Sequence, residues 1–243
     1  MTDKIFAGRL ALVTGASRGI GAATAEALGR AGAHVILAAR SSGGLEEVEE
    51  RIHQAGGTAT IAPMDLAEGD SIARLAAAVS GRWEALDILV LNAAMLGNLT
   101  PVPMIDGKEF ARLMTLNVSA QQALIAAFDP LLRASGHARV LGITSSVGAK
   151  PRAYWGAYGA SKAAFETLLL AYAEEVRAIG NIRVAIVDPG ATATAMRAIA
   201  YPGEDPATIQ QPADVADALL RLLREDFETG ARVRASEIRA SPA

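Results

Sequence analysis

Tyr158 and Lys162 lie four residues apart in the stretch YGASK. If Ala157–Ile179 forms a helix, both side chains project from one face of it. A phenol ordinarily titrates near ~10, and a neighbouring ammonium group favours the phenolate form. The pair could therefore supply an acid or a base near neutral pH. A tyrosine and a lysine at this spacing are also common by chance, so the pair alone is better explained as a partly buried tyrosine beside a surface lysine.

Ser145 and Asn117 carry polar groups that could act with this pair. Ser145 ends the apolar run ARVLGITSS, thirteen residues before Tyr158, where its hydroxyl could hold a carbonyl or hydroxyl group of a ligand. Ser146 is adjacent, and the spacing favours Ser145. Asn117 lies in TLNVS, inside a long stretch of helical character, where an asparagine amide competes for backbone hydrogen bonds. It is either required there or simply a tolerated polar residue.

A glycine-rich turn follows the first apolar run, in the stretch TGASRGIG. Gly15, Gly19 and Gly21 would let the backbone approach a pyrophosphate, and free N–H groups at the start of the next helix would face that anion. The spacing differs from the GxGxxG fingerprint of dinucleotide-binding folds. The alternative is a tight strand-to-helix turn that binds no ligand.

Two arginines bear on which dinucleotide would bind. The second apolar run ends in Arg40, where folds that prefer NAD usually carry an acidic residue for the ribose 2′-hydroxyl. Arg18 lies within the glycine-rich turn. Two guanidinium groups near the adenosine ribose would suit a 2′-phosphate, which favours NADP(H) over NAD(H). The alternative is a pair of solvated surface arginines.

The order of the apolar runs predicts the scaffold that must position these residues. The runs are continuous in hydrophobicity, as in strands buried on both faces, and stretches of helical length separate them. This alternation predicts a doubly wound α/β domain of Rossmann type, with a mostly parallel sheet of about seven strands and helices on both faces. The runs are RLALVTG, AHVILAAR, TATIAPMD, LDILVLNAA, ARVLGITSS and IRVAIVDPG. The expected helices span Ile20–Ala31, Gly44–Ala55, Asp70–Trp83, Asp106–Arg133, Tyr158–Ile179 and Pro212–Arg224.

Two stretches rich in proline and glycine predict loops, Leu96–Ile105 and Ala191–Gln211. A loop as long as 191–211 within a compact domain is often functional, so we expect it to close over a substrate. The chain has no visible internal repeat, low-complexity segment or linker. We therefore expect residues 1–243 to form one domain.

The composition narrows the classes of protein. With 51% hydrophobic and 20% charged residues, the chain can bury a core, and its net charge of −3 gives no basic footprint for nucleic acid. The absence of cysteine excludes disulfides, thiolate metal sites and a cysteine nucleophile, and three scattered histidines argue against a His-rich metal site. No stretch has the pattern of a signal peptide or a transmembrane helix, so we expect a cytoplasmic protein with no membrane partner.

Together these residues resemble the short-chain dehydrogenase/reductase family. The glycine-rich turn matches the family signature TGxxxGxG, and LNAA matches its NAG element with alanine in place of the glycine. DPGATAT matches the PG element of the family, and the stretches RAYWGAYGASK and DPGATATAMRA are most similar to a bacterial subgroup of uncharacterised, NADP-preferring oxidoreductases. The residues that match the family's catalytic tetrad are Asn117, Ser145, Tyr158 and Lys162.

The resemblance implies a role for each of these four residues. Tyr158 would protonate a carbonyl oxygen during reduction or deprotonate an alcohol during oxidation, and Ser145 would hydrogen-bond that oxygen. Lys162 would lower the pKa of the tyrosine and bind the nicotinamide ribose, while Asn117 would hold a water that links Lys162 to solvent. The implied reaction is reversible hydride transfer between NADP(H) and a small carbonyl or alcohol substrate, without a metal.

The resemblance also implies which residues hold NADP(H), with NAD less favoured. Asp65, beside Leu66, would accept a hydrogen bond from the adenine amino group, and Asn92-Ala93-Ala94 would pass along the adenosine. Thr194, with Thr192 near it, would touch the carboxamide and the phosphates. The full expected set is Gly15, Ser17, Arg18, Gly19, Ile20, Gly21, Arg40, Asp65, Leu66, Asn92, Ala93, Ala94, Tyr158, Lys162, Pro189, Gly190, Thr192 and Thr194.

The chain departs from the family pattern in two places. Ala94 adds one methyl group near the cofactor, which we expect to be tolerated, and the stretch TGARVRASE lacks the usual glycine-ended strand, so the last strand should be short. The family usually forms homodimers or homotetramers through the helices at 106–133 and 158–179. Two alternatives stay open: a dinucleotide-sensing regulator without turnover, and an epimerase, dehydratase or lyase on the same fold.

Four residues near the proposed pair have two interpretations each. Tyr154 and Trp155 could line a substrate pocket or simply pack the start of the helix. Lys150 and Arg152 could contact an acidic substrate, but a solvated loop explains them better.

Overall fold

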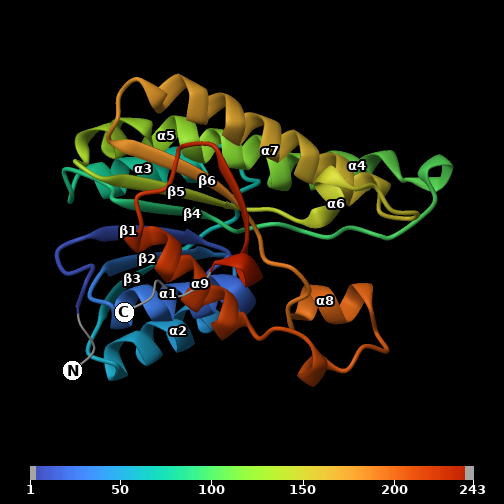
Figure 1. Ribbon diagram of the computed structural model, residues 1–243, viewed down its shortest axis with the longest axis horizontal. Helices are drawn as coiled ribbons and strands as arrows, with labels where there is room; N and C mark the ends of the chain where they lie inside the picture. Colours follow the sequence, from blue (N-terminus) through green and yellow to red (C-terminus); the bar gives the residue numbers. More distant parts are fainter. Residues whose placement is uncertain (1–3, 239–243) are drawn as a thin grey trace.

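A parallel sheet of seven strands forms the centre of the computed structural model, which describes residues 4–238 (Figure 1). The strand order is β3-β2-β1-β4-β5-β6-β7, and every pair of neighbouring strands is parallel. The central strands are buried on both faces, which is why their sequences are continuous in hydrophobicity. The strands span Leu10–Thr14 (β1), His34–Ala39 (β2), Thr58–Pro63 (β3), Ile88–Leu91 (β4), Ala138–Ile143 (β5), Ile182–Asp188 (β6) and Ala231–Arg234 (β7).

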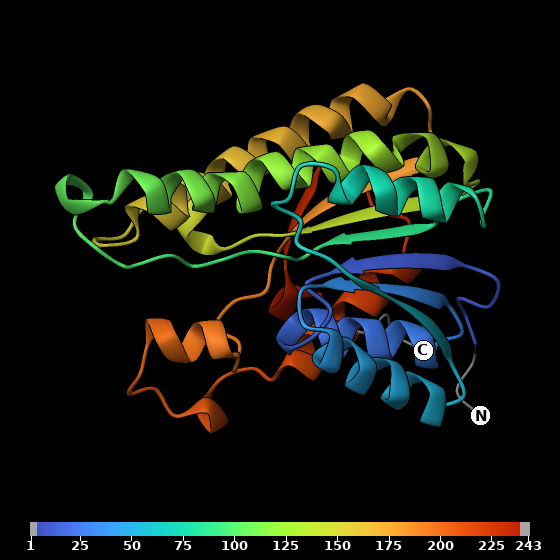
Figure 2. The same ribbon diagram turned by 180° about the vertical axis from the view of Figure 1, so that it is seen from behind.

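Helices cover both faces of this sheet (Figures 1 and 2). One face carries α1 (Gly19–Arg30), α2 (Ser42–Gln54) and α9 (Pro212–Arg224). The other carries α3 (Ser71–Ser80), α5 (Ala120–Ala134) and α7 (Gly156–Arg177), while α4 (Gly107–Met114) extends past the sheet beside α7 (Figure 1). The α7 helix lies directly on β5, because a Cβ added at Gly142 would come within 2.1 Å of the Leu169 side chain. These layers confirm the doubly wound fold class.

The structure differs from the expected elements at several places. The single helix expected at Asp106–Arg133 is divided by a π-helical turn at Thr115–Ser119, between α4 and α5. The expected loop 191–211 contains α8 (Ala195–Ala200) and a 3₁₀ turn at Pro206–Thr208, and α6 (Ser146–Ala149) follows β5. The last strand, β7, is short as expected, with four residues.

The topology places the candidate site residues at one edge of the sheet. The strand order reverses between β1 and β4, and in open α/β sheets the crevice outside the carboxyl ends at such a point is where ligands bind. Gly15, Asn92, Ser145 and Pro189 each follow the carboxyl end of one of the four strands β1, β4, β5 and β6. Within residues 4–238, no helix combines the length and hydrophobicity needed to cross a membrane.

Candidate active site

The glycine-rich turn between β1 and α1 is built for close approach of a ligand. Gly15 and Gly19 have φ values of +66° and +58°, which side chains of L-residues rarely adopt. A Cβ on Gly21 would lie 2.3 Å from the carbonyl oxygen of Gly15, so the turn tolerates no side chain there. The first turn of α1 has no side-chain cap and no acidic residue, and its N–H groups remain available to an anion. This cradle fits the pyrophosphate of a dinucleotide.

Thr14 ties the glycine-rich turn to the segment after β4. Its buried hydroxyl oxygen accepts hydrogen bonds from the N–H groups of Asn92 and Ala93, at 3.0 and 3.1 Å, and its O–H donates to the Val90 carbonyl. The Asn92 amide in turn donates to the Thr14 carbonyl at 2.9 Å. The sequence-predicted cofactor residues Gly15 and Asn92 are therefore held next to each other.

Asn117 uses its side-chain amide to connect three elements. Its Oδ1 accepts from the Met95 N–H, and its Nδ2 donates to the Met95 carbonyl, both at 2.9 Å. The same Nδ2 donates to the Ser161 hydroxyl at 3.0 Å, and that hydroxyl donates to the Tyr158 carbonyl at 2.8 Å. The π-helical turn around Asn117 is a distortion that often marks functional sites. Asn117 thus fixes the first turns of α7, which carry Tyr158 and Lys162.

Tyr158 lies on the first turns of α7 with its side chain buried. The only hydrogen-bond contact of this side chain within the described residues is a weak one, from the hydroxyl to the sulfur of Met196 at 4.0 Å. Burial raises the pKa of Tyr158 well above its ordinary value, and the Asp188 carboxylate acts in the same direction. The lowering of this pKa by Lys162 that the resemblance implies is therefore not seen in this arrangement, where desolvation of the phenolate dominates.

Lys162 is buried one turn further along α7. Its Nζ donates to the carbonyl of Ile143, at the end of β5, at 2.9 Å, and lies 5.7 Å from the centroid of the Tyr158 ring. Burial lowers the pKa of Lys162 to about 8, while the Glu166 carboxylate acts in the opposite direction. The spacing of Tyr158 and Lys162 correctly predicted that both lie on one face of α7. The Lys162 side chain, however, is buried, so the alternative of a surface lysine is wrong.

Glu166 supplies a buried negative charge beneath Lys162. It accepts hydrogen bonds from the Thr144 hydroxyl and from the Arg232 guanidinium of β7. A Cβ on Gly148 would lie 3.0 Å from the Glu166 carboxylate, so α6 also packs against this group. The network links the carboxyl end of β5, the α7 helix and the edge strand β7 around the lysine.

Ser145 and Ser146 differ in what their hydroxyls contact. Ser146 accepts a hydrogen bond from Arg152 at 3.3 Å. Ser145 has an extended backbone at the start of α6, and its hydroxyl has no hydrogen-bond partner among residues 4–238. A hydroxyl available at the carboxyl end of β5 is consistent with the choice of Ser145 over Ser146.

The residues expected on the adenosine side gather at the carboxyl ends of β2 and β3. Arg40 is mostly exposed and lies 3.9 Å from the Asp65 carboxylate, while Arg18 is exposed at the edge of the glycine-rich turn. A Cβ on Gly44 would lie 3.0 Å from the Ser17 side chain, so the start of α2 packs against the same turn. The buried side chain of Leu66 follows Asp65.

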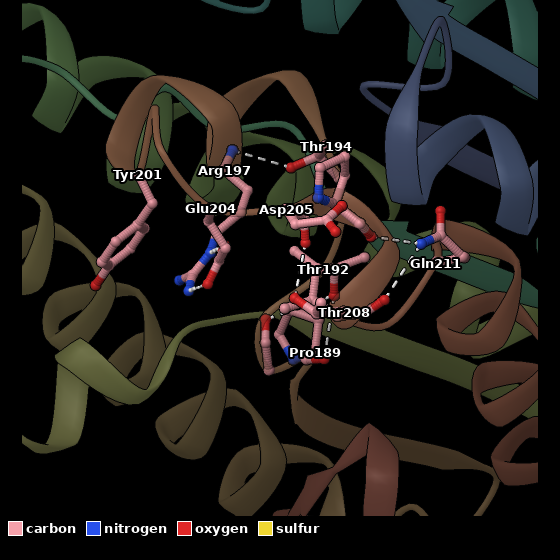
Figure 3. A network of polar contacts seen from close by, with 12 residues as sticks. Pro189, Thr192, Thr194, Arg197, Tyr201, Glu204, Asp205, Thr208 and Gln211 are labelled. Atoms are coloured by element: carbon pink, nitrogen blue, oxygen red, sulfur yellow. Dashed lines mark hydrogen bonds and ion pairs between the residues drawn. The ribbon is translucent and has the colours of Figure 1, made fainter.

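The segment 189–211 folds back over the glycine-rich turn. A Cβ on Gly19 would lie 3.3 Å from the Thr194 side chain. Thr192 pairs with Gln210, and the Gln210 amide donates to the Pro189 carbonyl at 2.8 Å. Figure 3 shows the core of this segment, in which Arg197 and Glu204 make two contacts of 2.6 Å and Thr194 caps α8. Segment 189–211 is therefore held in place by hydrogen bonds and an ion pair between its own residues, and it is not a free loop.

Several residues that shape the site were not predicted. Thr14 and Ser161 had a visible signal, since each is a hydroxyl residue inside a motif already singled out. For Met196, Glu166 and Arg232, the sequence does not indicate which distant element each side chain contacts.

Replacing Thr14 with valine tests the link between the two strand ends. Thr14→Val keeps the shape but leaves the Ala93 N–H without an acceptor and the Asn92 N–H with only the Val90 carbonyl at 3.2 Å. We therefore expect a loss of about 2 kcal/mol in the free energy of unfolding, measured in urea. Thr24→Val is the matched control, because Thr24 is equally buried and donates only to Ile20 within α1. Equal stability of the two variants would contradict the role given to Thr14.

Comparison with known proteins agrees with this geometry. Residues 9–205 match the family model of the short chain dehydrogenases. The oxidoreductase YciK of Escherichia coli (strain K12) is 36% identical over 221 residues, which cover 90% of this chain and 87% of YciK.

Two solved structures are similar over nearly the whole fold. A short chain dehydrogenase from Pseudomonas syringae has a TM-score of 0.90 at 38% identity and covers 96% of both chains. One from Shigella flexneri 2a, complexed with NADP, has a TM-score of 0.90 at 35% identity and covers 96% of this chain and 99% of that one. The buried tyrosine and lysine on α7, the glycine-rich turn and these likenesses lead to one assignment: the chain belongs to the short chain dehydrogenase family and is an NAD(P)-dependent oxidoreductase.

Proposed function

We propose that the protein transfers a hydride between NADP(H) and a small carbonyl or alcohol substrate, with Tyr158 as the general acid and base. The observation that carries this proposal is the position of Tyr158, whose buried hydroxyl has no nitrogen or oxygen partner among residues 4–238. A homodimer or homotetramer and a cytoplasmic location stay predictions.

The raised pKa of Tyr158 supports its role as an acid. A phenol that holds its proton throughout the neutral range can donate it to a carbonyl oxygen during reduction. When bound, the reduced dinucleotide supplies the hydride that forms the new C–H bond. The Ser145 hydroxyl would donate a hydrogen bond to the same oxygen, and the charge of Lys162 would stabilise the phenolate left behind.

Two guanidinium groups support NADP(H) rather than NAD(H). Arg18 lies in the glycine-rich turn, next to Ser17, against which the start of α2 packs, and Arg40 follows the end of β2, which carries no acidic residue. The contact between Arg40 and Asp65 is long and exposed, so it contributes little and leaves the guanidinium able to turn toward a 2′-phosphate. The NADP complex of the similar Shigella protein favours the same cofactor.

Tyr158→Phe tests the proton role. The variant keeps the ring and its packing but lacks the transferable proton, so we expect carbonyl reduction to fall by about 10²–10⁴-fold in kcat. The measurement is NADPH oxidation across a panel of ketones and aldehydes, with NADPH affinity determined separately and expected to be retained. Tyr154→Phe is the matched control, because Tyr154 is exposed on the segment just before α7. If Tyr158→Phe turned over carbonyl substrates nearly as fast as Tyr154→Phe, Tyr158 would not be the proton donor.

Arg40→Ala tests the preference for the phosphorylated dinucleotide. A charge-assisted contact to the 2′-phosphate exists only with NADPH, so the ratio of kcat/KM for NADPH to that for NADH should fall about tenfold. Arg74→Ala, which removes an exposed arginine from α3, should leave the ratio unchanged. Equal kcat/KM for the two cofactors in the unmodified protein would overturn the preference.

A further inference from the structure

The Tyr158 side chain lies in a small apolar cluster, and its hydroxyl contacts the sulfur of Met196. Side chains from four separate segments pack around the buried Tyr158 ring. Trp155 stands edge-on to that ring with 6.0 Å between centroids, and Met196 places its sulfur 4.0 Å from the Tyr158 hydroxyl. We call the residues around Tyr158 the apolar wall; its members are Leu96, Leu99, Val147, Trp155, Met196 and Ala200.

Aromatic side chains extend the wall outward. The ring of Tyr201 lies 5.8 Å from that of Trp155 at an interplanar angle of 32°. Further out, Ile199 on α8 and Val102 before α4 are large apolar side chains with 73% and 68% of their surface exposed. Apolar side chains are therefore present both in the cluster around Tyr158 and at the surface of the segments that carry it, which is typical of a site for apolar groups.

Charged side chains near the wall are already paired or lie outside it. The Arg197 guanidinium is bound to Glu204 at 2.6 Å and stacks 3.7 Å from the Tyr201 ring centroid, so it holds α8 in place. Arg152 is exposed, and its two contacts are long ones to the neutral hydroxyls of Ser146 and Tyr201.

Two buried charges lie near Tyr158: the Lys162 ammonium, 5.7 Å from its ring centroid and bound to the Ile143 carbonyl, and the Asp188 carboxylate. Asp188 lies at the end of β6, and its charge opposes ionisation of the phenol. A substrate carboxylate packed against the apolar wall would leave water, which is unfavourable. Of the cations nearby, the Lys162 ammonium is already bound to the Ile143 carbonyl and Arg197 to Glu204, while Arg152 stays at the exposed surface. An alkyl or aryl group would instead gain from the same burial.

We infer that the substrate is a neutral ketone or secondary alcohol whose carbonyl carbon carries an apolar, ring-sized group packed against Trp155 and Met196. This inference rests on the proposed function, since it assigns the substrate class of the same site. The apolar wall should bind apolar carbonyl compounds more tightly than 2-oxo acids and more tightly than short ketones that lack the apolar group.

A binding experiment tests the inference without relying on turnover. The chain has two tryptophans, Trp83 and Trp155, and Trp83 stacks on His34 at the amino-terminal end of β2. In the Trp83→Phe protein saturated with NADP⁺, Trp155 becomes the only tryptophan reporter. Its fluorescence is titrated with 4-phenyl-2-butanone, with 2-butanone and with 2-oxo-4-phenylbutanoate, in which a carboxylate replaces the methyl group beside the carbonyl.

We expect 4-phenyl-2-butanone to bind at least about tenfold more tightly than either comparison compound, because only it buries a ring without burying a charge. In the same background, Met196→Gln should weaken its binding about tenfold by placing an amide in the wall. Met196→Leu, which keeps the wall apolar, should restore most of the affinity. Equal binding of the three compounds, tighter binding of the carboxylate, or no binding of 4-phenyl-2-butanone would overturn the inference.

The same compounds distinguish failure of this inference from failure of the proposed function. Oxidation of NADPH with 2-oxo-4-phenylbutanoate but not with 4-phenyl-2-butanone would overturn the substrate class and keep the oxidoreductase reaction. Selective binding of 4-phenyl-2-butanone, with no NADPH oxidation by any carbonyl compound, would support the apolar site and overturn the proposed reaction.

Discussion

The burial of the Lys162 ammonium group is the constraint on which the rest of the site depends. An ammonium removed from water is costly unless the fold supplies compensating dipoles and charges. Here the Ile143 carbonyl accepts a hydrogen bond from it, and the Glu166 carboxylate, held by Thr144 and Arg232, adds a favourable field. The β5 strand end, the α7 helix and the edge strand β7 must therefore be in register for the lysine to be charged.

The same packing determines the behaviour of Tyr158. Because the ring lies between Lys162 and the apolar wall, its phenolate is desolvated and its pKa is raised. Asn117 and Ser161 fix the turn of α7 that carries it. The protein thus combines a protonated phenol with a buried cation, and it places both beside a glycine-rich turn that can hold a dinucleotide.

The sequence alone predicted the sheet and the site motifs, and physical reasons explain why the other features could not be predicted. Continuous apolar runs predicted the parallel sheet, and the comparisons confirm the family that the motifs resembled. The π-helical turn at Thr115–Ser119 was missed, because the hydrophobic pattern of a helix hardly changes across one such turn. The α8 helix was missed because it is short and depends on the contact between Arg197 and Glu204. Burial, which raises the pKa of Tyr158, could not be predicted, since spacing shows a neighbouring charge but not burial.

The most direct test of this account is the titration of Lys162 itself. The protein would be labelled with ¹⁵N at lysine Nζ, and the Lys162 signal would be assigned by its loss in Lys162→Met and followed with pH without cofactor. The account predicts a midpoint at about 8, because the ammonium is buried against the end of β5. A Lys162 signal that titrates at the ordinary lysine value of 10.5 would contradict it.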